Sequence, residues 1–296
     1  MKNNIVILSS FLLFSCSDFY QPAVVSARKE ATQIGLEIMK NGGNAYDAMI
    51  ATHLALAVVH PTAGNIGGGG FFVYHHKDGS SGSLDFREMA PQKAFKDMYL
   101  DENGDVIPDM STLGGAAVGV PGSISAIYKI HSKFGSLPIE DLFEPAINLA
   151  KNGFVVTQKQ SNSLTGKLED FIKVNGEESL YSKRYYEGDT IKNIKFAETL
   201  SKISKFGPEI FYGGEIGEMI INSVNKAGGI MTLNDLENYK SIWRDPVKFK
   251  YKNLVSYWKN FIASSNSNGA KSIIVIQPVP QLFKNLSITE KQITNH

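Results

Sequence analysis

The residues with the clearest chemical potential are Asp85, Arg87 and Glu88, which stand together in the run LDFREMAP. A guanidinium group is permanently charged and presents a planar fork of N–H donors, so an arginine suits the bidentate binding of a carboxylate. Most arginines at the end of a strand are nevertheless solvated charges. With Arg87 between them, the two carboxylates are more simply its ion-pair partners than a catalytic acid–base couple.

Four histidines raise the question of a metal site. His53 and His60 are seven positions apart, whereas two zinc ligands on one helical face are typically four positions apart. Neither these two nor the adjacent pair His75 and His76 have a cysteine or an acidic residue at ligand spacing. We therefore expect structural or solvated histidines, no metal site and no cofactor.

The four consecutive glycines Gly67–Gly70 could present backbone N–H groups to a phosphate. No Gly-Lys-Ser/Thr follows them, however, and the next segment has the pattern of a strand, not of the helix that would hold the phosphate. We therefore do not expect a nucleotide site. The simpler expectation is that the glycines let a strand pack closely against the helix before them.

The elements that must position these residues begin with a helix over 45–59. Asn44 and Asp47 have the spacing of an N-cap and an acid in the first turn, and the helix they start is small or apolar on nearly every side, which predicts a buried central helix. Residues 71–75 then form a predicted strand. Residues 84–87 alternate apolar and charged side chains, which predicts a returning strand with one buried face.

The remaining chain mixes helices and loops without an internal repeat. Residues 96–114 are polar and rich in turn signals, which predicts a surface loop, and residues 157–190 should hold helical fragments. We expect Pro145 to break one predicted helix in two, because proline has no N–H to donate. The pattern supports an α/β (α+β) class, with further helices over 22–40, 123–134, 139–151, 196–206, 216–226 and 233–239.

Length and charge narrow the range of partners. The chain has 296 residues, which is ordinary for one large domain. Its 30 Lys and Arg against 29 Asp and Glu leave a formal charge of +1, which gives no general attraction to nucleic acid or to acidic membranes.

The N-terminal residues 1–16 have the pattern of an export signal: a lysine, an apolar run and then Cys16, the only cysteine in the chain. Residues 13–16 (LFSC) resemble the cleavage box of bacterial lipoproteins, in which the cysteine becomes a lipidated N-terminus. A plain signal peptide is the alternative. Because the run is too short to span a bilayer, we expect membrane attachment only through a lipid anchor, in the bacterial periplasm or cell envelope.

Three motifs, GGNAYDA, HPTAGNIGGGGFF and LDFREMAP, occur in this order and at this spacing. They resemble the gamma-glutamyltransferase (glutathione hydrolase) family, as do residues 118–154 and 211–239 further along. The resemblance covers roughly residues 22–255 and predicts a large-subunit-like domain over 17–255, followed by a divergent tail over 256–296.

The resemblance implies an N-terminal-nucleophile hydrolase with an αββα sandwich, here incomplete on its C-terminal side. It implies that Arg87 binds the α-carboxylate of a gamma-glutamyl donor such as glutathione, with water, an amino acid or a peptide as acceptor, and that Asn44, Asp47 and the glycine run shape the scaffold. The family's nucleophile is a threonine in a Thr-Thr-His motif, and no Thr-Thr pair occurs in this sequence.

We therefore expect no catalytic residue in this chain. Its activity would depend on a small subunit that carries the nucleophile. The competing hypothesis is a non-catalytic protein, truncated or acting as a surface binding module, that keeps the scaffold without the chemistry.

Overall fold

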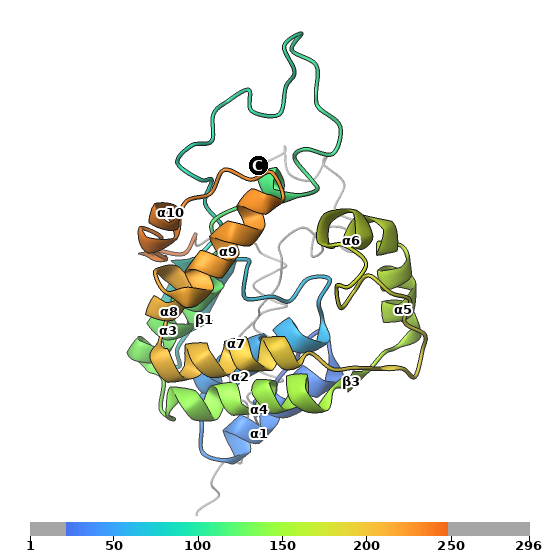
Figure 1. Ribbon diagram of the computed structural model, residues 1–296. Coiled ribbons are helices and arrows are strands. Elements are labelled where there is room, and N and C mark those ends of the chain that lie inside the picture. The colour runs from blue at the N-terminus through green and yellow to red at the C-terminus, as the bar shows by residue number, and fades with distance from the viewer. Residues whose placement is uncertain (1–21, 248–296) are drawn as a thin grey trace, which may run out of the picture. The chain divides into compact units, whose positions relative to one another are not determined.

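The computed structural model describes residues 22–247, so the predicted signal peptide, Cys16 and the predicted tail over 256–296 lie outside the described residues. Helices and short strands are mixed along this part of the chain (Figure 1). The elements are α1 (Lys29–Lys40), α2 (Ala45–Val59), β1 (Phe71–His75), β2 (Ser81–Asp85), η1 (Gly115–Ala117), α3 (Ser123–Phe134), α4 (Ile139–Asn152), β3 (Phe154–Val155), α5 (Gln158–Thr165), α6 (Leu168–Asn175), β4 (Thr190–Ile191), α7 (Ile194–Phe206), α8 (Glu209–Tyr212), α9 (Glu215–Lys226), α10 (Leu233–Glu237) and β5 (Ile242–Arg244).

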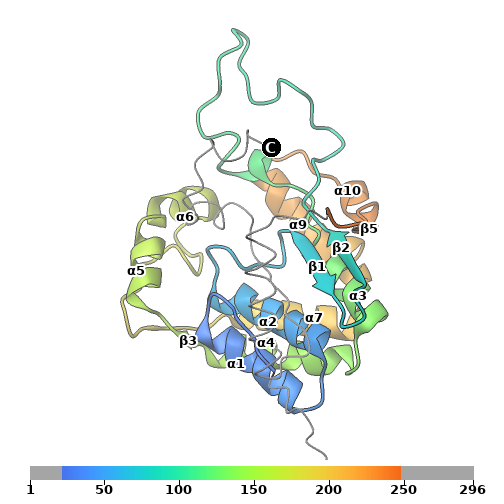
Figure 2. The same ribbon diagram turned by 180° about the vertical axis from the view of Figure 1, so that it is seen from behind.

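Helix α2 is the centre of the core, as its sequence predicted. Most of its residues are buried, and it packs against α1, α3 and α4. The Asn44 side chain accepts hydrogen bonds from the N–H groups of Tyr46 and Asp47, and the Asp47 carboxylate accepts one from the Asn44 N–H, which makes a complete capping box. Figures 1 and 2 show α1, α2, α4 and α7 side by side as one helical layer.

The main sheet has the strand order β1-β2-β5, with both pairs antiparallel. Phe72 pairs with Leu84 and Leu84 pairs with Trp243, so these three side chains share one face of the sheet. This inner face is covered by α2 and α3: the Phe72 ring lies 6.0 Å from that of Tyr46, and the Trp243 ring 5.9 Å from that of Phe134.

The outer face of the same sheet carries apolar side chains that are open to solvent within the described part of the chain. Phe71, Val73 and Ile242 are 49%, 50% and 48% exposed. An αββα sandwich needs a second sheet against such a face. The other sheet among residues 22–247 is the two-residue pair of β3 and β4, so the described sandwich is incomplete.

Helix α4 corrects one expectation. It runs unbroken from Ile139 to Asn152 with Pro145 inside it, where the sequence predicted two short helices. Pro145 is the seventh of its 14 residues, so the missing N–H removes one hydrogen bond from the middle of the helix. The buried side chains Leu142, Phe143 and Ala146 hold the segment against α2 and α7, and this packing outweighs the local preference to break.

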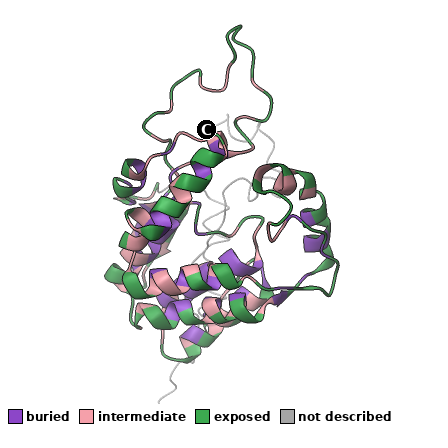
Figure 3. Cartoon of the chain, viewed as in Figure 1, coloured by how far each residue is buried: buried purple, intermediate pink, exposed green. Residues whose placement is uncertain are grey.

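The outer segments agree with most of the remaining predictions. The helix predicted over 22–40 begins only at Lys29, after an extended stretch. Helices α5 and α6 are the fragments predicted within 157–190, and α6 has no buried residue (Figure 3). Residues 96–114 form the predicted surface loop, in which every residue is exposed or partly exposed.

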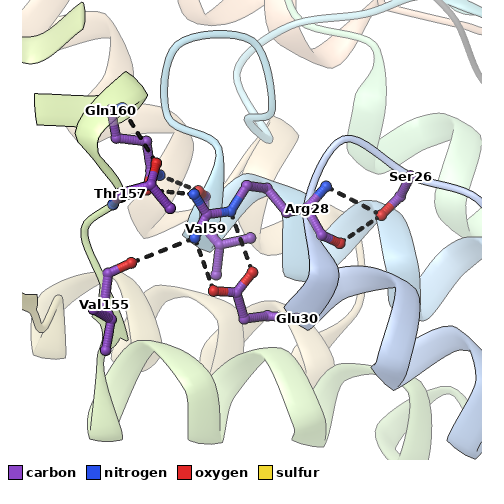
Figure 4. A network of polar contacts seen from close by, with 7 residues as sticks. All are labelled: Ser26, Arg28, Glu30, Val59, Val155, Thr157 and Gln160. Atoms are coloured by element: carbon purple, nitrogen blue, oxygen red, sulfur yellow. Dashed lines mark hydrogen bonds and ion pairs between the residues drawn. The ribbon is translucent and has the colours of Figure 1, made fainter. Parts of the chain in front are cut away.

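A buried polar network joins the start of α1 to the end of α2 (Figure 4). Arg28 is only 9% exposed; its guanidinium pairs with Glu30 at 2.8 Å and donates to the side-chain oxygen of Gln160 and to the Val155 carbonyl. The Gln160 amide in turn donates to the Val59 carbonyl at 2.7 Å. Because a buried charge is stable only when it is paired, the network fixes the extended residues before α1 against α2 and α5.

Candidate functional site

Arg87 lies two residues beyond the end of β2, and its side chain is 61% exposed. Its guanidinium pairs loosely with the Glu88 carboxylate, Nη1 to Oε2 at 3.5 Å. Its backbone N–H donates to Asp85 Oδ1 at 3.1 Å. The three residues therefore lie together, as predicted, but the Asp85 carboxylate accepts a hydrogen bond from the Arg87 backbone instead of pairing with its guanidinium.

The ion-pair partner of Asp85 is Arg244, which the sequence analysis did not identify. Arg244 Nε donates to Asp85 Oδ2 at 2.8 Å from the end of β5. The guanidinium of Arg87 is left with one partly exposed partner, Glu88, among the described residues. A pair this long, with the Arg87 side chain mostly in solvent, contributes little to stability.

Tyr239 completes the surroundings of Arg87 and was also missed. Its hydroxyl donates to the Arg87 carbonyl at 2.9 Å, and the residue is buried. Burial raises the pKa of the Tyr239 hydroxyl to about 12, and the nearby charges of Asp85 and Glu88 act in the same direction. The hydroxyl therefore keeps its proton at neutral pH and remains a hydrogen-bond donor.

The glycine run does allow a close approach, but its partner differs from the prediction. A methyl group on Gly69 would stand 2.2 Å from the Phe86 carbonyl oxygen, and the backbones of Gly70 and Phe86 exchange hydrogen bonds of 3.2 and 2.9 Å. The glycines thus lie against residues 86–88 and not against helix α2. The element that follows them in the chain is the strand β1, so the run lacks the loop-then-helix order of a phosphate-binding loop.

The same run is tied to the start of α3. The Gly68 carbonyl accepts hydrogen bonds from the Gly122 N–H at 2.8 Å, and from the backbone N–H and the hydroxyl of Ser123, each at 3.0 Å. The glycine run, the end of β2 and the start of α3 are therefore joined around the backbone of Arg87.

Asp47 contributes to the scaffold and not to the surface near Arg87. It is completely buried, and its carboxylate accepts hydrogen bonds from the Asn44 N–H at 2.9 Å and from the backbone N–H and hydroxyl of Ser136. It therefore fastens the N-terminus of α2 to the turn that follows α3.

The histidines have different surroundings. His75 is exposed, and the His76 ring contacts the Tyr46 hydroxyl, with Nε2 at 3.2 Å. His53 lies within α2, and its Nε2 is buried without a hydrogen-bond partner among the described residues. Within residues 22–247 no three His, Cys, Asp or Glu side chains are grouped as metal ligands. No helix in this same range is long and apolar enough to cross a membrane.

His53 is partly buried with its Nε2 atom fully enclosed, and this predicts a pH-dependent stability. Burial lowers its pKa to about 4, whereas an unfolded chain has a histidine pKa of about 6.5. Between these two values only the unfolded state binds the proton, so the free energy of unfolding should fall by at most about 1.4 kcal/mol per pH unit as the pH drops through this range. Urea denaturation of the wild type and of His53→Gln at pH 7, 6 and 5 measures the difference.

The exposed His75→Gln serves as the control, since its stability should follow the wild type at each pH. Equal pH dependence in the wild type and in His53→Gln would contradict the assignment. Burial and the charges of Arg28 and Lys159 also lower the pKa of His60, so some pH dependence should remain in the His53 variant.

Comparison with solved structures identifies the class of this fold. The chain resembles gamma-glutamyltranspeptidase from Helicobacter pylori, with a TM-score of 0.77 and 38% identity over 87% of this chain and 70% of that one. It also resembles gamma-glutamyltranspeptidase from Pseudomonas nitroreducens complexed with L-DON, with a TM-score of 0.74 and 35% identity over 87% of this chain and 71% of that one. The fold is therefore that of the N-terminal-nucleophile hydrolases, as predicted.

The sequence pattern that defines Gamma-glutamyltranspeptidase matches residues 31–294. The chain belongs to the gamma-glutamyltranspeptidase family. Among curated relatives, the glutathione hydrolase proenzyme of Escherichia coli K12 is 38% identical over 249 residues, which are 80% of this chain and 42% of that protein. The glutathione hydrolase proenzyme of Pseudomonas sp. A14 is 41% identical over 77% of this chain and 40% of its own length. The chain thus spans about two-fifths of these relatives.

Proposed function

We propose that this chain provides the donor-binding part of a gamma-glutamyltransferase or glutathione hydrolase, with Arg87 as the group that binds the α-carboxylate of the gamma-glutamyl donor. The observation that carries the proposal is the contrast between side chain and backbone at Arg87. The guanidinium is 61% exposed and, within residues 22–247, has a single loose ion pair, while the backbone N–H and carbonyl are both hydrogen-bonded. A charge held in place but open to a ligand suits carboxylate recognition.

The reaction that follows from the family is transfer of a gamma-glutamyl group to water, an amino acid or a peptide. A threonine hydroxyl attacks the gamma-carbonyl carbon, the amine of the donor leaves with a proton, and the acceptor then cleaves the resulting ester. Arg87 takes no part in the bond changes. It holds the far end of the donor, so that binding energy is used for orientation.

The exposed outer face of the β1-β2-β5 sheet supports a further part of this proposal. Phe71, Val73 and Ile242 present apolar area that an isolated sheet would leave in water. We expect the nucleophile-bearing part of the sandwich, a small subunit in this family, to pack on this face.

Turnover by purified residues 17–296 tests the proposal directly. Since the sequence has no Thr-Thr pair, we expect no release of product from a gamma-glutamyl anilide and no self-cleavage into two bands. Glutathione should nevertheless bind, as measured by calorimetry. Turnover that copurifies with this chain would contradict the assignment of the nucleophile elsewhere, and the absence of glutathione binding would contradict the donor-binding role.

We also propose export and lipid anchoring through Cys16, which rests on the N-terminal sequence pattern alone. Cys16→Ala removes the thiol that would carry the lipid, so radioactive palmitate fed to cells should label the wild type and not the variant. Equal labelling of the two proteins would refute the anchor. Cys16→Ser keeps nearly the size of cysteine but has no thiol, so it should also remain unlabelled.

A further inference from the structure

We propose that Tyr239 and Arg244 are positioning residues for Arg87. They hold its backbone from two sides, so that the guanidinium is placed before a carboxylate ligand arrives. The inference rests on the proposed donor-binding role of Arg87 and adds to it the residues that set the affinity.

The first support comes from Tyr239, whose hydroxyl donates to the Arg87 carbonyl at 2.9 Å. Tyr239 is itself fixed, because its ring stacks on that of Tyr212 with the centroids 5.9 Å apart and the planes within 6°. The Tyr212 hydroxyl donates to the Pro121 carbonyl and accepts from the Ser125 N–H, both at 3.0 Å. The donor to Arg87 is thus anchored to the start of α3.

The second support is the space left by Gly122. A methyl group on this residue would stand 2.1 Å from both the Tyr239 hydroxyl and the Phe86 carbonyl oxygen. Gly122 has a φ of −114°, which any residue can adopt, so the constraint is purely steric. The absence of a side chain at this position lets the hydroxyl reach the Arg87 carbonyl.

The third support is the hydrogen-bond chain on the opposite side. Arg244 Nε donates to Asp85 Oδ2 at 2.8 Å, and Asp85 Oδ1 accepts from the Arg87 N–H at 3.1 Å. Arg244 is placed by the pairing of β5 with β2, in which it lies opposite Ser83. One short segment, residues 239–244, therefore fixes both the carbonyl and the N–H of Arg87.

Fixing the backbone matters because the arginine side chain is long and loses rotamer freedom when it binds a ligand. A displacement of about 1 Å in a binding group can cost two orders of magnitude in rate or affinity. Both residues contact Arg87 through its backbone, Tyr239 at the carbonyl and Arg244 at the N–H through Asp85.

The test uses the full chain and the variant Tyr239→Phe, which keeps the ring and its stacking on Tyr212 but removes the donor. We expect glutathione to bind about tenfold more weakly, as the loss of one hydrogen bond that places the charge implies. Hydrogen exchange at the Arg87 amide, measured without ligand, should become faster by a similar factor, with little change in Tm. Gly122→Ala should show both effects together with a lower Tm, because its methyl group meets the Phe86 carbonyl oxygen as well as the Tyr239 hydroxyl.

The matched control is Tyr185→Phe, which removes another buried tyrosine donor to a backbone carbonyl, that of Leu180 at 2.8 Å. It should change neither glutathione affinity nor exchange at Arg87. Unchanged exchange at Arg87 in Tyr239→Phe would overturn the inference, as would faster exchange with unchanged affinity. If the wild type does not bind glutathione, the proposed function fails, and the exchange result alone then decides whether residues 239–244 position Arg87.

Discussion

Replacing Arg87 with lysine is expected to weaken the use of a gamma-glutamyl donor roughly ten- to a hundredfold in kcat/KM, equivalent to about 1.5–3 kcal/mol, once the nucleophile-bearing part is supplied by co-expression. Lysine keeps the charge but offers no planar fork for two parallel hydrogen bonds to a carboxylate. The folded structure should persist, because the side chain is 61% exposed and its pair with Glu88 is loose. Glutathione titration of the chain alone should show the same loss as a weaker Kd.

The competing explanation is a structural ion pair, which predicts a lower melting temperature with kcat/KM per folded molecule unchanged. Measuring both quantities on one preparation separates the two. Arg184→Lys is a suitable control, since Arg184 is an exposed arginine on the loop between α6 and β4. Unchanged kcat/KM in Arg87→Lys would refute the carboxylate-binding role.

Replacing Asp47 with alanine is expected to lower the free energy of unfolding by about 3 kcal/mol, the largest stability effect we predict for one residue. The buried carboxylate binds the N–H of Asn44 and both the N–H and hydroxyl of Ser136. Its removal leaves those donors without an acceptor and opens the contact between α2 and the turn after α3. Urea denaturation gives the value from the midpoint and slope.

Asp47→Asn should lose less than the alanine variant, because one side-chain oxygen remains to accept. The control is Asp141→Ala, which also removes an acid from the first turn of a helix but at an exposed position. There only the interaction with the helix dipole is lost, at most about 1 kcal/mol. A loss in Asp47→Ala no larger than in Asp141→Ala would show that the buried hydrogen bonds do not stabilise the fold.

The elements that could be predicted from the sequence are those determined by local signals. The helix α2 has its cap, its composition and its end within residues 44–60, and the strands β1 and β2 alternate around a turn. These signals act over a few residues, and the structure confirms α2 and β1. The returning strand β2 covers Ser81–Asp85 and not the predicted residues 84–87, because its pairing with β1 reaches back to Ser81 opposite His75. Arg87 was singled out from the sequence because it stands in the motif LDFREMAP.

The surroundings of Arg87 could not be predicted, because they depend on contacts between distant segments. A strand of three residues such as β5 is too short for any alternation to appear, so Arg244 had no recognisable place. The predicted partner of the glycine run was wrong for a related reason. Glycines indicate that another segment of the chain comes close, but not which segment it is. Pro145 shows the opposite case, in which tertiary packing overrides a local signal.

The contacts of Arg87 also determine when its site can form during protein synthesis. Its carbonyl is bound by a residue 152 positions later, and Asp85 pairs with a residue 159 positions later. At about 5–20 residues per second, these partners leave the ribosome roughly 8–30 s after Arg87 does. Helix α2 and the hairpin of β1 and β2 can be complete long before then. Placement of the Arg87 backbone, and with it the proposed binding of a carboxylate, must therefore wait until residues 239–244 have emerged.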